Sequence, residues 1–392
     1  MNTVQSSVNI IADFLNKRET SAGETVFDWE EIAAIFKKHE MSGVLYTQCA
    51  HLLPDSIKPE LARQFHSTIF YYSQRTWLEN EIRKLLDSKG IPYFTVKGSE
   101  VARFYPRPAL RTIGDTDLIV HTEDRSQVHE LLMQMGFLNE SRPNEGAWIY
   151  YKNSLELELH DRLVYSGVVN QKLHADFFND CWRYVNDNHL NWSFHFLFIL
   201  LHLRKHFMYT GVGFRQFVDI AVLTKSNKDL DWAWIEEKLH NLDLWNFAQR
   251  VFALNQKWFG IAPPLKIDRI DDLFLEEATE QICYNGLFGN DNDDNLGNAM
   301  VNRVANSEIS PAGMVRSVFA DIFLSYDRMK TMRQYRYLSG KSYLLPIAWI
   351  HRAGRTLAQK RAGHTIKKIV KTSFVTKKKI DQRSEQLEKW GL

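Results

Sequence analysis

The sequence predicts an α+β fold in which a small mixed sheet is flanked by helical regions on its N-terminal and C-terminal sides. Apolar residues recur at helical spacing from Asn9 to about Lys89. Short runs rich in β-forming residues follow between 91 and 160, and the helical period returns from 201 to Gly260. A chain of 392 residues is too long for one ordinary core. We therefore expect two or three packed units.

The first expected region, residues 1–88, is helical. Its opening, "MNTVQSSVNIIADFLNKRET", has no basic stretch followed by an apolar stretch, so it indicates an amphipathic helix and no export signal. Helical spacing continues in "WEEIAAIFKKHEMSGVLYTQCAHLL" and in "WLENEIRKLLDSKG", where Gly90 is a natural helix terminator.

The second expected region, residues 89–165, is the α/β core, and it begins with a strand, a turn and a helix. The run "IPYFTV" is short, apolar and rich in β-formers, which predicts a strand. It leads into "KGSEVARFYP", where Gly98 and Ser99 open a helix that ends near Pro106.

The rest of the core is expected to add a second strand, a helix and a hairpin. "DLIV" (117–120) predicts the strand and "RSQVHELLMQMGF" (125–137) the helix. "AWIYYKN" and "LELELH" (155–160) predict the two arms of the hairpin, because the second arm alternates strictly between apolar and polar residues.

Three further regions are expected after the core: a helical domain packing on it (166–262), a loop and helical extension (263–340) and a basic C-terminal tail (341–392). The most apolar run, "FHFLFILLHL", is about half the length of a membrane-spanning helix, which indicates a buried core helix. The polar stretch "GNDNDDNLGNAM" predicts an exposed loop.

Charge and cysteine content limit the partners and the compartment. The 49 lysines and arginines nearly balance the 47 acids, so bulk charge does not indicate nucleic acid or membrane. Three widely separated cysteines with no metal-ligand spacing fit a reducing compartment, and we expect a cytoplasmic protein.

The tail is the regional exception, since residues 341–380 contain no acid. A solvated helical face is one interpretation of this stretch, and an anionic membrane surface is the other. Nucleic acid is the least favoured partner, because the tail has few aromatic residues for stacking on bases.

The stretch "RTIGDTDLIV" places Asp115 and Asp117 one residue apart at the start of a strand. Residues two apart on a strand share a face, roughly 6 to 7 Å apart along the chain. Two such carboxylates repel unless a cation sits between them, and Mg²⁺ takes oxygen ligands of this kind. Magnesium usually also binds substrate phosphates, so the pair predicts a nucleoside triphosphate as the remaining ligand.

A phosphate-binding segment and a third acid are found nearby. Gly98 allows close approach of the backbone, Ser99 and the first amides of a helix favour an anion, and Lys97 adds a positive charge. In "LELELH" we expect Glu158 as third ligand or base, with Glu156 as the substitute, because a register shift of two residues would exchange them.

Several other residues allow two interpretations. Arg111 is a phosphate clamp or a counterion of the acidic pair. Arg215 pairs within its helix with Asp219 or faces a nucleotide phosphate. His160 orients Glu158, acts as a base or is a core histidine.

His202 and His206, four apart on a helix, have a spacing that can hold zinc. Structural packing is the favoured interpretation, because the His-Glu-x-x-His pattern is absent.

These motifs, in this order, resemble the nucleotidyltransferase fold shared by DNA polymerase β and the antibiotic-modifying nucleotidyltransferases. The sequence is also similar to a bacterial nucleotidyltransferase family often encoded beside polysaccharide-assembly genes. The segments that carry this similarity are "FTVKGSEVARFYPRPALRTIGDTDLIV", "LELELH" and "LRKHFMYTGVGFRQFVDIAVL". The resemblance covers roughly residues 30 to 260. The interval from Ser99 to Asp115 is longer than usual in polymerase β-like patterns, which predicts an extended helix or loop.

The resemblance implies that Gly98 and Ser99 hold the triphosphate and that Asp115, Asp117 and Glu158 bind two Mg²⁺ ions, with Mn²⁺ as a second candidate. The chain would move a nucleotidyl group from an NTP to an acceptor, in surface polysaccharide biosynthesis, and release pyrophosphate. A sugar, a protein or a small molecule could be the acceptor. The alternative is a non-catalytic nucleotide-binding or membrane-docking accessory protein of a polysaccharide-assembly complex.

Overall fold

The computed structural model describes residues 2–21, 27–140, 146–153, 155–165, 172–209, 211–285, 326–330, 333–338, 340–358 and 385–392. The chain divides into two compact units. The first contains residues 1–207, 211–289 and 390–392, and the second contains 208–210 and 290–389. The finer boundaries expected from the sequence stay predictions.

The first unit is built around a five-stranded mixed sheet in the order β1-β2-β5-β4-β3. Its strands are β1 (Tyr93–Val96), β2 (Asp115–Val120), β3 (Leu138–Asn139), β4 (Trp148–Lys152) and β5 (Leu155–His160). Strands β2 and β5 are parallel, and every other neighbouring pair is antiparallel. A separate ribbon pairs β6 (Val185–Asn186) with β7 (His189–Leu190).

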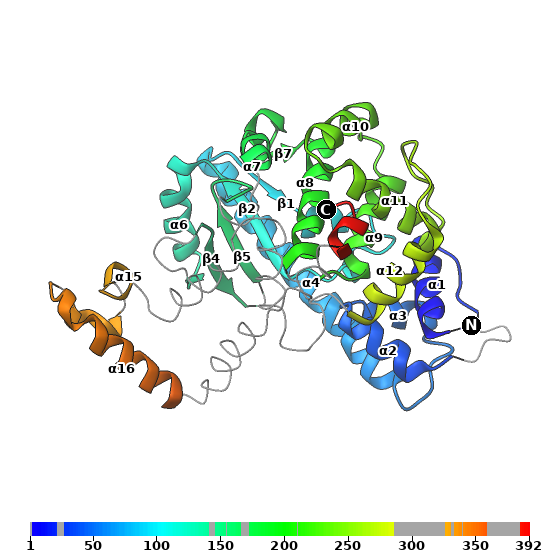
Figure 1. The fold of residues 1–392 in the computed structure, drawn as a ribbon, viewed down its shortest axis with the longest axis horizontal. Helices are drawn as coiled ribbons and strands as arrows, with labels where there is room; N and C mark the ends of the chain where they lie inside the picture. Colours follow the sequence, from blue (N-terminus) through cyan, green and yellow to red (C-terminus); the bar gives the residue numbers. More distant parts are fainter. Residues whose placement is uncertain are drawn as a thin grey trace. The chain divides into compact units, whose positions relative to one another are not determined.

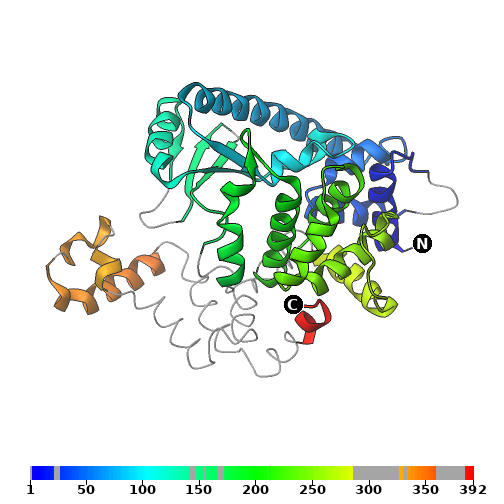
Figure 2. The same cartoon turned by 90° about the horizontal axis from the view of Figure 1, so that it is seen from above.

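Helices cover both faces of the sheet. On one face α4 (Lys58–Lys89) and α6 (Arg125–Gln134) share a hydrophobic cluster with Leu118 of β2 and Leu157 of β5. The opposite face of β1, with Phe94 and Val96, joins the large core that contains α8 (Trp192–Tyr209). Figure 2 shows the long α4 along one side of the sheet and α8, in green, on the other.

The remaining helices of the first unit come before, between and after the five strands along the chain (Figure 1). Before the strands come α1 (Thr3–Leu15), α2 (Trp29–Lys38) and α3 (Ser42–Cys49); between them lie α5 (Gly98–Ala102) and the short turns η1 (Pro108–Leu110) and η2 (Thr122–Asp124); after them come α7 (Lys172–Phe178), η3 (Cys181–Tyr184), α9 (Phe214–Ser226), α10 (Trp232–Asn241), α11 (Trp245–Phe259) and α12 (Asp272–Asn285). One hydrophobic core runs through α1, α2, α3, α8, α9 and α11.

The second unit is described over α15 (Tyr326–Lys330), η4 (Arg333–Leu338), η5 (Ser342–Leu344) and α16 (Leu345–Ala358). It has a small apolar cluster of its own, made by Met329, Tyr335, Leu338 and Ala348. Trp390, in contrast, is buried in the first unit, where its ring centroid lies 4.1 Å from that of Phe207 and 5.1 Å from that of Phe274.

The α+β class expected from the sequence is confirmed. The predicted hairpin corresponds to β4 and β5, and the apolar run around Phe196 forms part of the buried helix α8. The extension between Ser99 and Asp115 is a loop: α5 stops at Ala102, and the turn η1 interrupts the path to β2. The predicted loop at 289–300 and residues 359–384 of the basic tail lie outside the described residues.

Among the residues that the structure describes, no helix combines the length and the apolar character needed to cross a lipid bilayer.

His39 links three helices and makes the first unit sensitive to acid. Its Nδ1 accepts a hydrogen bond from the Phe214 amide at 3.0 Å, and its Nε2 lies 3.0 Å from the Cys283 carbonyl oxygen. Burial lowers the pKa of His39 to about 4. Because the unfolded chain binds the proton more tightly, stability present above pH 6.5 is lost as the pH falls toward 4.

We expect protonation linked to His39 to lower the free energy of unfolding by roughly 2 kcal/mol when the pH falls from 7 to 5. Urea unfolding of the wild-type chain and of His39→Asn at both pH values measures it, since asparagine does not titrate. The variant should lose less stability on acidification by that amount. An equal loss in both proteins would show that His39 is not held neutral.

Candidate functional site

The acids expected from the sequence meet on one face of the sheet. The parallel register pairs Asp115 with Glu156 and Asp117 with Glu158, and His160 follows two residues later on β5. Side chains of a strand alternate between faces, so these five residues share one face, while Thr116 and Leu157 point to the other. The two-residue spacing of both motifs produces this clustering.

Asp117 is the most constrained of the acids. Its Oδ1 accepts from the Lys97 ammonium at 2.8 Å and lies 3.2 Å from Nε2 of His160. Burial alone would raise the pKa of Asp117, but Lys97 and His160 hold it well below its usual range. Its Oδ2 is buried and has no hydrogen-bond partner among the described residues. A buried carboxylate oxygen of this kind is suited to a further cationic ligand.

Asp115 carries the opposite shift. Burial and the neighbouring Asp117 carboxylate raise its pKa, Lys97 counteracts them, and Glu158 adds a further repulsion. Two carboxylates that disfavour each other's charge are stabilised when a divalent cation lies between them.

Glu158 and His160 complete a group of three possible metal ligands with Asp117. One ligand atom from each lies within 4.8 Å of the others in the described residues, and Asp115 is outside this group. His160 Nε2 is 3.1 Å from the Glu158 carboxylate, so the imidazole bridges the two acids. Burial lowers the pKa of His160, but its hydrogen bonds with Asp117 and Glu158 raise it overall. A protonated His160 would therefore supply the positive charge that a cation would otherwise bring.

Lys97 adopts an unusual backbone conformation where β1 meets α5. Its φ is 59° and its ψ is −118°, a region that non-glycine residues rarely occupy. The Lys97 amide donates to Nε2 of His195 at 2.8 Å, which holds the backbone in this conformation. Lys97 thus binds Asp117 through its side chain and His195 of α8 through its backbone amide.

His195 is suited to this accepting role. It is 1% exposed, and its ring stacks on Trp192 with a centroid distance of 5.0 Å. Burial lowers its pKa to about 4, so at neutral pH the imidazole is uncharged and Nε2 can accept. This contact could not be predicted from local sequence pattern, because the two residues are 98 positions apart.

Gly98 and Ser99 begin α5 beside the acids. A Cβ at Gly98 would lie 2.8 Å from Cγ2 of Ile113, so a larger residue at this position would have to displace that side chain. The hydroxyl of Ser99 is buried and lies close to Glu79 of α4. Gly98 therefore keeps the start of α5 against the start of β2.

Helix α8 forms the wall opposite the acids. Phe198, Leu201, His202 and Lys205 line a pocket together with Lys97 and Glu158. Burial and the charge of Lys97 lower the pKa of Lys205, while Asp117 counteracts them. Lys205 is a candidate that the sequence interpretation missed. Helical spacing of Phe198, Leu201, His202 and Lys205 on one face would have been the signal.

His202 and His206 face each other, with their Nε2 atoms 2.7 Å apart. Burial lowers the pKa of His202 well below its usual value and that of His206 to about 4. Neutral imidazoles at this distance share one proton in a hydrogen bond. The pair fits the packing interpretation that we favoured for it.

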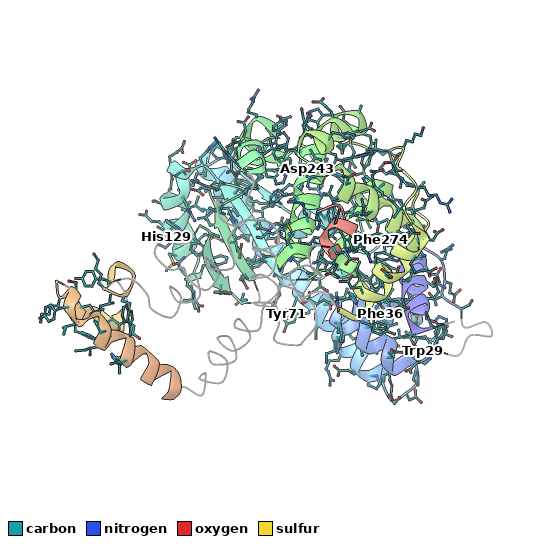
Figure 3. All side chains as sticks on the ribbon, in the orientation of Figure 1. Trp29, Phe36, Tyr71, His129, Asp243 and Phe274 are labelled. Atoms are coloured by element: carbon teal, nitrogen blue, oxygen red, sulfur yellow. The ribbon has the colours of Figure 1, made fainter. Side chains whose placement is uncertain are left out.

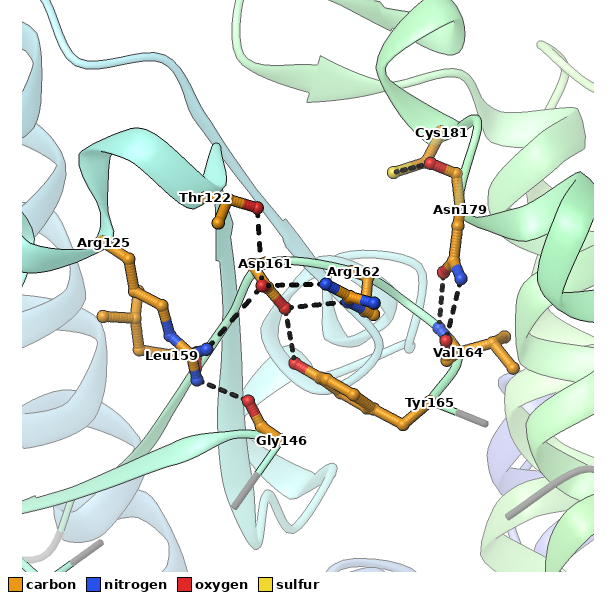
Figure 4. Close-up of polar contacts among 10 residues, drawn as sticks. All are labelled: Thr122, Arg125, Gly146, Leu159, Asp161, Arg162, Val164, Tyr165, Asn179 and Cys181. Carbon is orange, nitrogen blue, oxygen red and sulfur yellow. Dashed lines mark hydrogen bonds and ion pairs between the residues drawn. The ribbon is translucent and has the colours of Figure 1, made fainter. Parts of the chain in front are cut away.

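The segment after β5 is held in place by Asp161 (Figure 4). Its carboxylate accepts from Arg162 at 3.1 Å and from the Tyr165 hydroxyl at 3.2 Å, and Arg125 lies 3.8 Å away. Arg162 and Tyr165 both line the pocket beside Glu158. Asp161 thus fixes one rim of the pocket.

Arg111 and Arg215 are held by acids other than Asp115 and Asp117. The Arg111 guanidinium makes two hydrogen bonds to Asp219, at 2.8 and 2.7 Å, and the Tyr105 hydroxyl donates to the same carboxylate at 2.6 Å. Arg215 instead pairs with Glu40 and donates to the Thr112 carbonyl oxygen at 3.0 Å.

The expected pairing of Arg215 with Asp219 within one helix is therefore wrong. The extended loop brings Arg111 to Asp219, and this contact replaces the intrahelical one. Phosphate contacts of Arg111 and Arg215 stay predictions. Glu156, the substitute third acid, lies opposite Asp115 and outside the group of Asp117, Glu158 and His160.

Comparison with known proteins identifies a matching family. A family model described as "uncharacterised nucleotidyltransferase" matches residues 25–260, more than half of the chain. No curated protein and no solved structure matches. The matched region includes every residue of the acidic group and the pocket around it.

Proposed function

The chain belongs to the uncharacterised nucleotidyltransferase family, and from this premise we propose that it moves an NMP group from an NTP to an acceptor hydroxyl or phosphate and releases pyrophosphate. The observation that carries the proposal is the acidic face of β2 and β5. Three carboxylates from Asp115, Asp117 and Glu158 share this face beside the start of α5.

The donor set fits a divalent cation. Asp117 presents a buried oxygen without a hydrogen-bond partner, and Asp115 is destabilised as an anion by its neighbours. Asp115, Asp117 and Glu158 would hold two Mg²⁺ or Mn²⁺ ions. Ions of this kind neutralise the charge that develops on a transferring phosphoryl group.

The residues around the acids would bind and orient the triphosphate. Lys97 and Lys205 bring two ammonium groups to one pocket, and the start of α5 presents the amides of Gly98 and Ser99. Transfer requires the attacking oxygen and the departing pyrophosphate to lie in line with the α-phosphorus. The lysines would stabilise the pyrophosphate as it leaves.

Two experiments test the proposal. Calorimetry with Mg²⁺ and each of the four NTPs should show binding by the full chain. Incubation with each α-labelled NTP and small-molecule extracts should transfer label to an acceptor. Absence of both NTP binding and label transfer, for a chain shown to be folded, would refute it.

His195 offers a test of the triphosphate segment. His195→Phe removes the acceptor of the Lys97 amide, and an unsatisfied buried amide costs about 1 to 3 kcal/mol. We expect the KM for NTP to rise on the order of 10-fold, with a smaller change in kcat.

His195→Gln is the matched variant, since its amide oxygen can accept the same hydrogen bond, and it should restore most of the affinity. Equal KM values for the wild-type chain and His195→Phe would contradict the positioning role. Thermal unfolding of both variants separates loss of folding from loss of affinity.

We also propose that the basic tail, residues 341–380, docks the chain on an anionic membrane from the cytoplasmic side, as part of a polysaccharide-assembly complex. The described part of the tail supports docking, because Tyr343, Ile347 and Ile350 are exposed by 74, 58 and 73%. Exposed apolar residues in an acid-free basic segment suit an interfacial helix.

Sedimentation with liposomes containing anionic lipid should therefore carry down the full chain, and the bound fraction should fall in high salt. The variant Ile347→Asn, Ile350→Asn should partition less. Neutral liposomes are the control. Equal partitioning of the variant and the wild-type chain would argue against docking through α16.

A further inference from the structure

A second pocket lies at the N-terminal ends of β2 and β5. It has a volume of about 620 Å³, which is within the usual range for small-molecule sites. Tyr71, Tyr72 and Gln74 of α4 line one side, and the loop before β2 and Asn153 line the other. Figure 3 marks Tyr71 on α4. Arg111, whose phosphate contact stays a prediction, is the one residue of the nucleotide chemistry proposed so far that also lines this pocket.

The second pocket adjoins the strand ends that lead into the acids. Gly114, which lines the second pocket, directly precedes Asp115, and Asn153 lies in the turn that leads into β5. Arg75 of the second pocket interacts electrostatically with Asp115 and Glu156. Asp117 and Glu158, one step further along the same strands, line the first pocket.

The positive charges of the second pocket are already paired. Arg75 donates to the Thr116 hydroxyl at 2.9 Å and to the Gly114 carbonyl oxygen at 2.8 Å, and Glu79 is its nearby counterion. Arg111 is held by Asp219 through two hydrogen bonds. A phosphate ester in this pocket would have to break one of these contacts while lying close to Asp115.

The remaining lining residues suit a neutral ring compound. Tyr71 is 53% exposed and Tyr72 is partly exposed, so aromatic faces are accessible to a ligand. Asn153 adds an amide group, which can both donate and accept hydrogen bonds. Aromatic faces against the apolar face of a ring, with an amide for its hydroxyls, are the groups that bind an uncharged sugar.

We propose that this pocket binds the acceptor and that the acceptor is a neutral saccharide. The inference rests on the proposed nucleotidyl transfer. A sugar hydroxyl would attack the α-phosphorus from the side of Asp115, forming an oxygen–phosphorus bond. The bond from that phosphorus to the bridging oxygen breaks, pyrophosphate leaves with the electron pair toward Lys97 and Lys205, and the hydroxyl proton passes to solvent.

Direct binding tests the pocket without requiring turnover. Ligand-observed NMR of the full chain with glucose, mannose and N-acetylglucosamine should detect binding of at least one sugar, and glucose 1-phosphate and uridine should bind more weakly. Tyr71→Ala and Tyr72→Ala should each weaken that binding on the order of 5- to 10-fold. Tyr71→Phe keeps the ring and should retain most of the affinity.

Trp77→Ala is the matched control. Trp77 is 59% exposed on the same helix but does not line the pocket, so its loss should leave sugar binding unchanged. Binding that is equal in Tyr71→Ala and the wild-type chain, preference for the phosphate ester or for uridine, or no sugar binding at all would each overturn the proposal.

Measuring NTP binding distinguishes an error in the saccharide assignment from an error in the proposed nucleotidyl transfer. If the wild-type chain binds NTP with Mg²⁺ but no neutral sugar, the acceptor assignment alone is wrong. If it binds sugar but no NTP, nucleotidyl transfer is wrong and the pocket remains a saccharide site. Tyr71→Ala should leave the KM for NTP within about twofold of the wild-type value, since Tyr71 is outside the first pocket.

Discussion

The double variant Asp115→Asn, Asp117→Asn is expected to release pyrophosphate more slowly than the wild-type chain by on the order of 10³-fold or more. Asparagine keeps the size of each side chain but removes the negative charge. The oxygens of Asp115 and Asp117 would then no longer hold a cation against the phosphates. Pyrophosphate release from the NTP that binds, measured with a coupled assay, gives the ratio.

The single variant Asp115→Asn should lose activity, but its folded state should be as stable as that of the wild-type chain or more stable. Burial and the Asp117 carboxylate raise the pKa of Asp115, so its charge destabilises the folded chain at neutral pH. Asparagine removes that repulsion, and the unfolding temperature should stay the same or rise. Loss of activity without loss of stability distinguishes a functional acid from a structural one.

The double variant Asp176→Asn, Asp229→Asn is the control, because both side chains are exposed and far from the acids in sequence. It should keep full activity. Normal turnover in the Asp115 and Asp117 double variant would show that these two carboxylates are not needed for the reaction. The active site of the chain would then have to lie elsewhere.

Arg111→Ala is expected to destabilise the first unit by about 3 to 5 kcal/mol. The guanidinium and the Asp219 carboxylate are 8% exposed each, and they are joined by two hydrogen bonds. Removing the arginine would leave the Asp219 charge buried with only the Tyr105 hydroxyl and no cation directly bound to it. Urea unfolding at pH 7, followed by circular dichroism, measures the loss.

A double-mutant cycle provides the control for this pair. Asp219→Leu should also destabilise the chain, and the variant with both changes should be more stable than the sum of the single losses predicts. Arg215→Ala is a useful comparison, because its partner Glu40 is one-third exposed and the loss should be smaller. If Arg111→Ala unfolds like the wild-type chain but has a higher KM for NTP, the arginine is a phosphate clamp.

The elements of the fold could be predicted because they depend on local pattern. Strict alternation in "LELELH" determines which side chains of β5 reach the core, and the two-residue spacing of Asp115 and Asp117 does the same for β2. Once both strands were expected in one sheet, their acids could be expected on one face. The parallel register then placed Glu158 opposite Asp117.

The parts of the site that were missed depend on contacts between distant segments. Lys205 and His195 belong to α8, and their spacing within that helix does not show which strand the helix will cover. The pairing of Arg111 with Asp219 depends on the path of the loop between α5 and β2. An i to i+4 pair is favourable within an isolated helix by only about 0.2 to 0.5 kcal/mol, so a buried bidentate contact readily replaces it.

Trp390 has a consequence for how the molecule tolerates proteolysis. The chain leaves the first unit at Gly289 and returns to it at Trp390, so about 100 intervening residues form a closed loop. Holding the two ends of such a loop together costs about 4 kcal/mol of chain entropy, which the burial of the indole among Phe207, Phe247 and Phe274 must outweigh. A single cut within that loop would place Trp390 on a separate C-terminal fragment, held to the first unit only by its own non-covalent contacts, and loss of that fragment would expose Phe207, Phe247 and Phe274 to water.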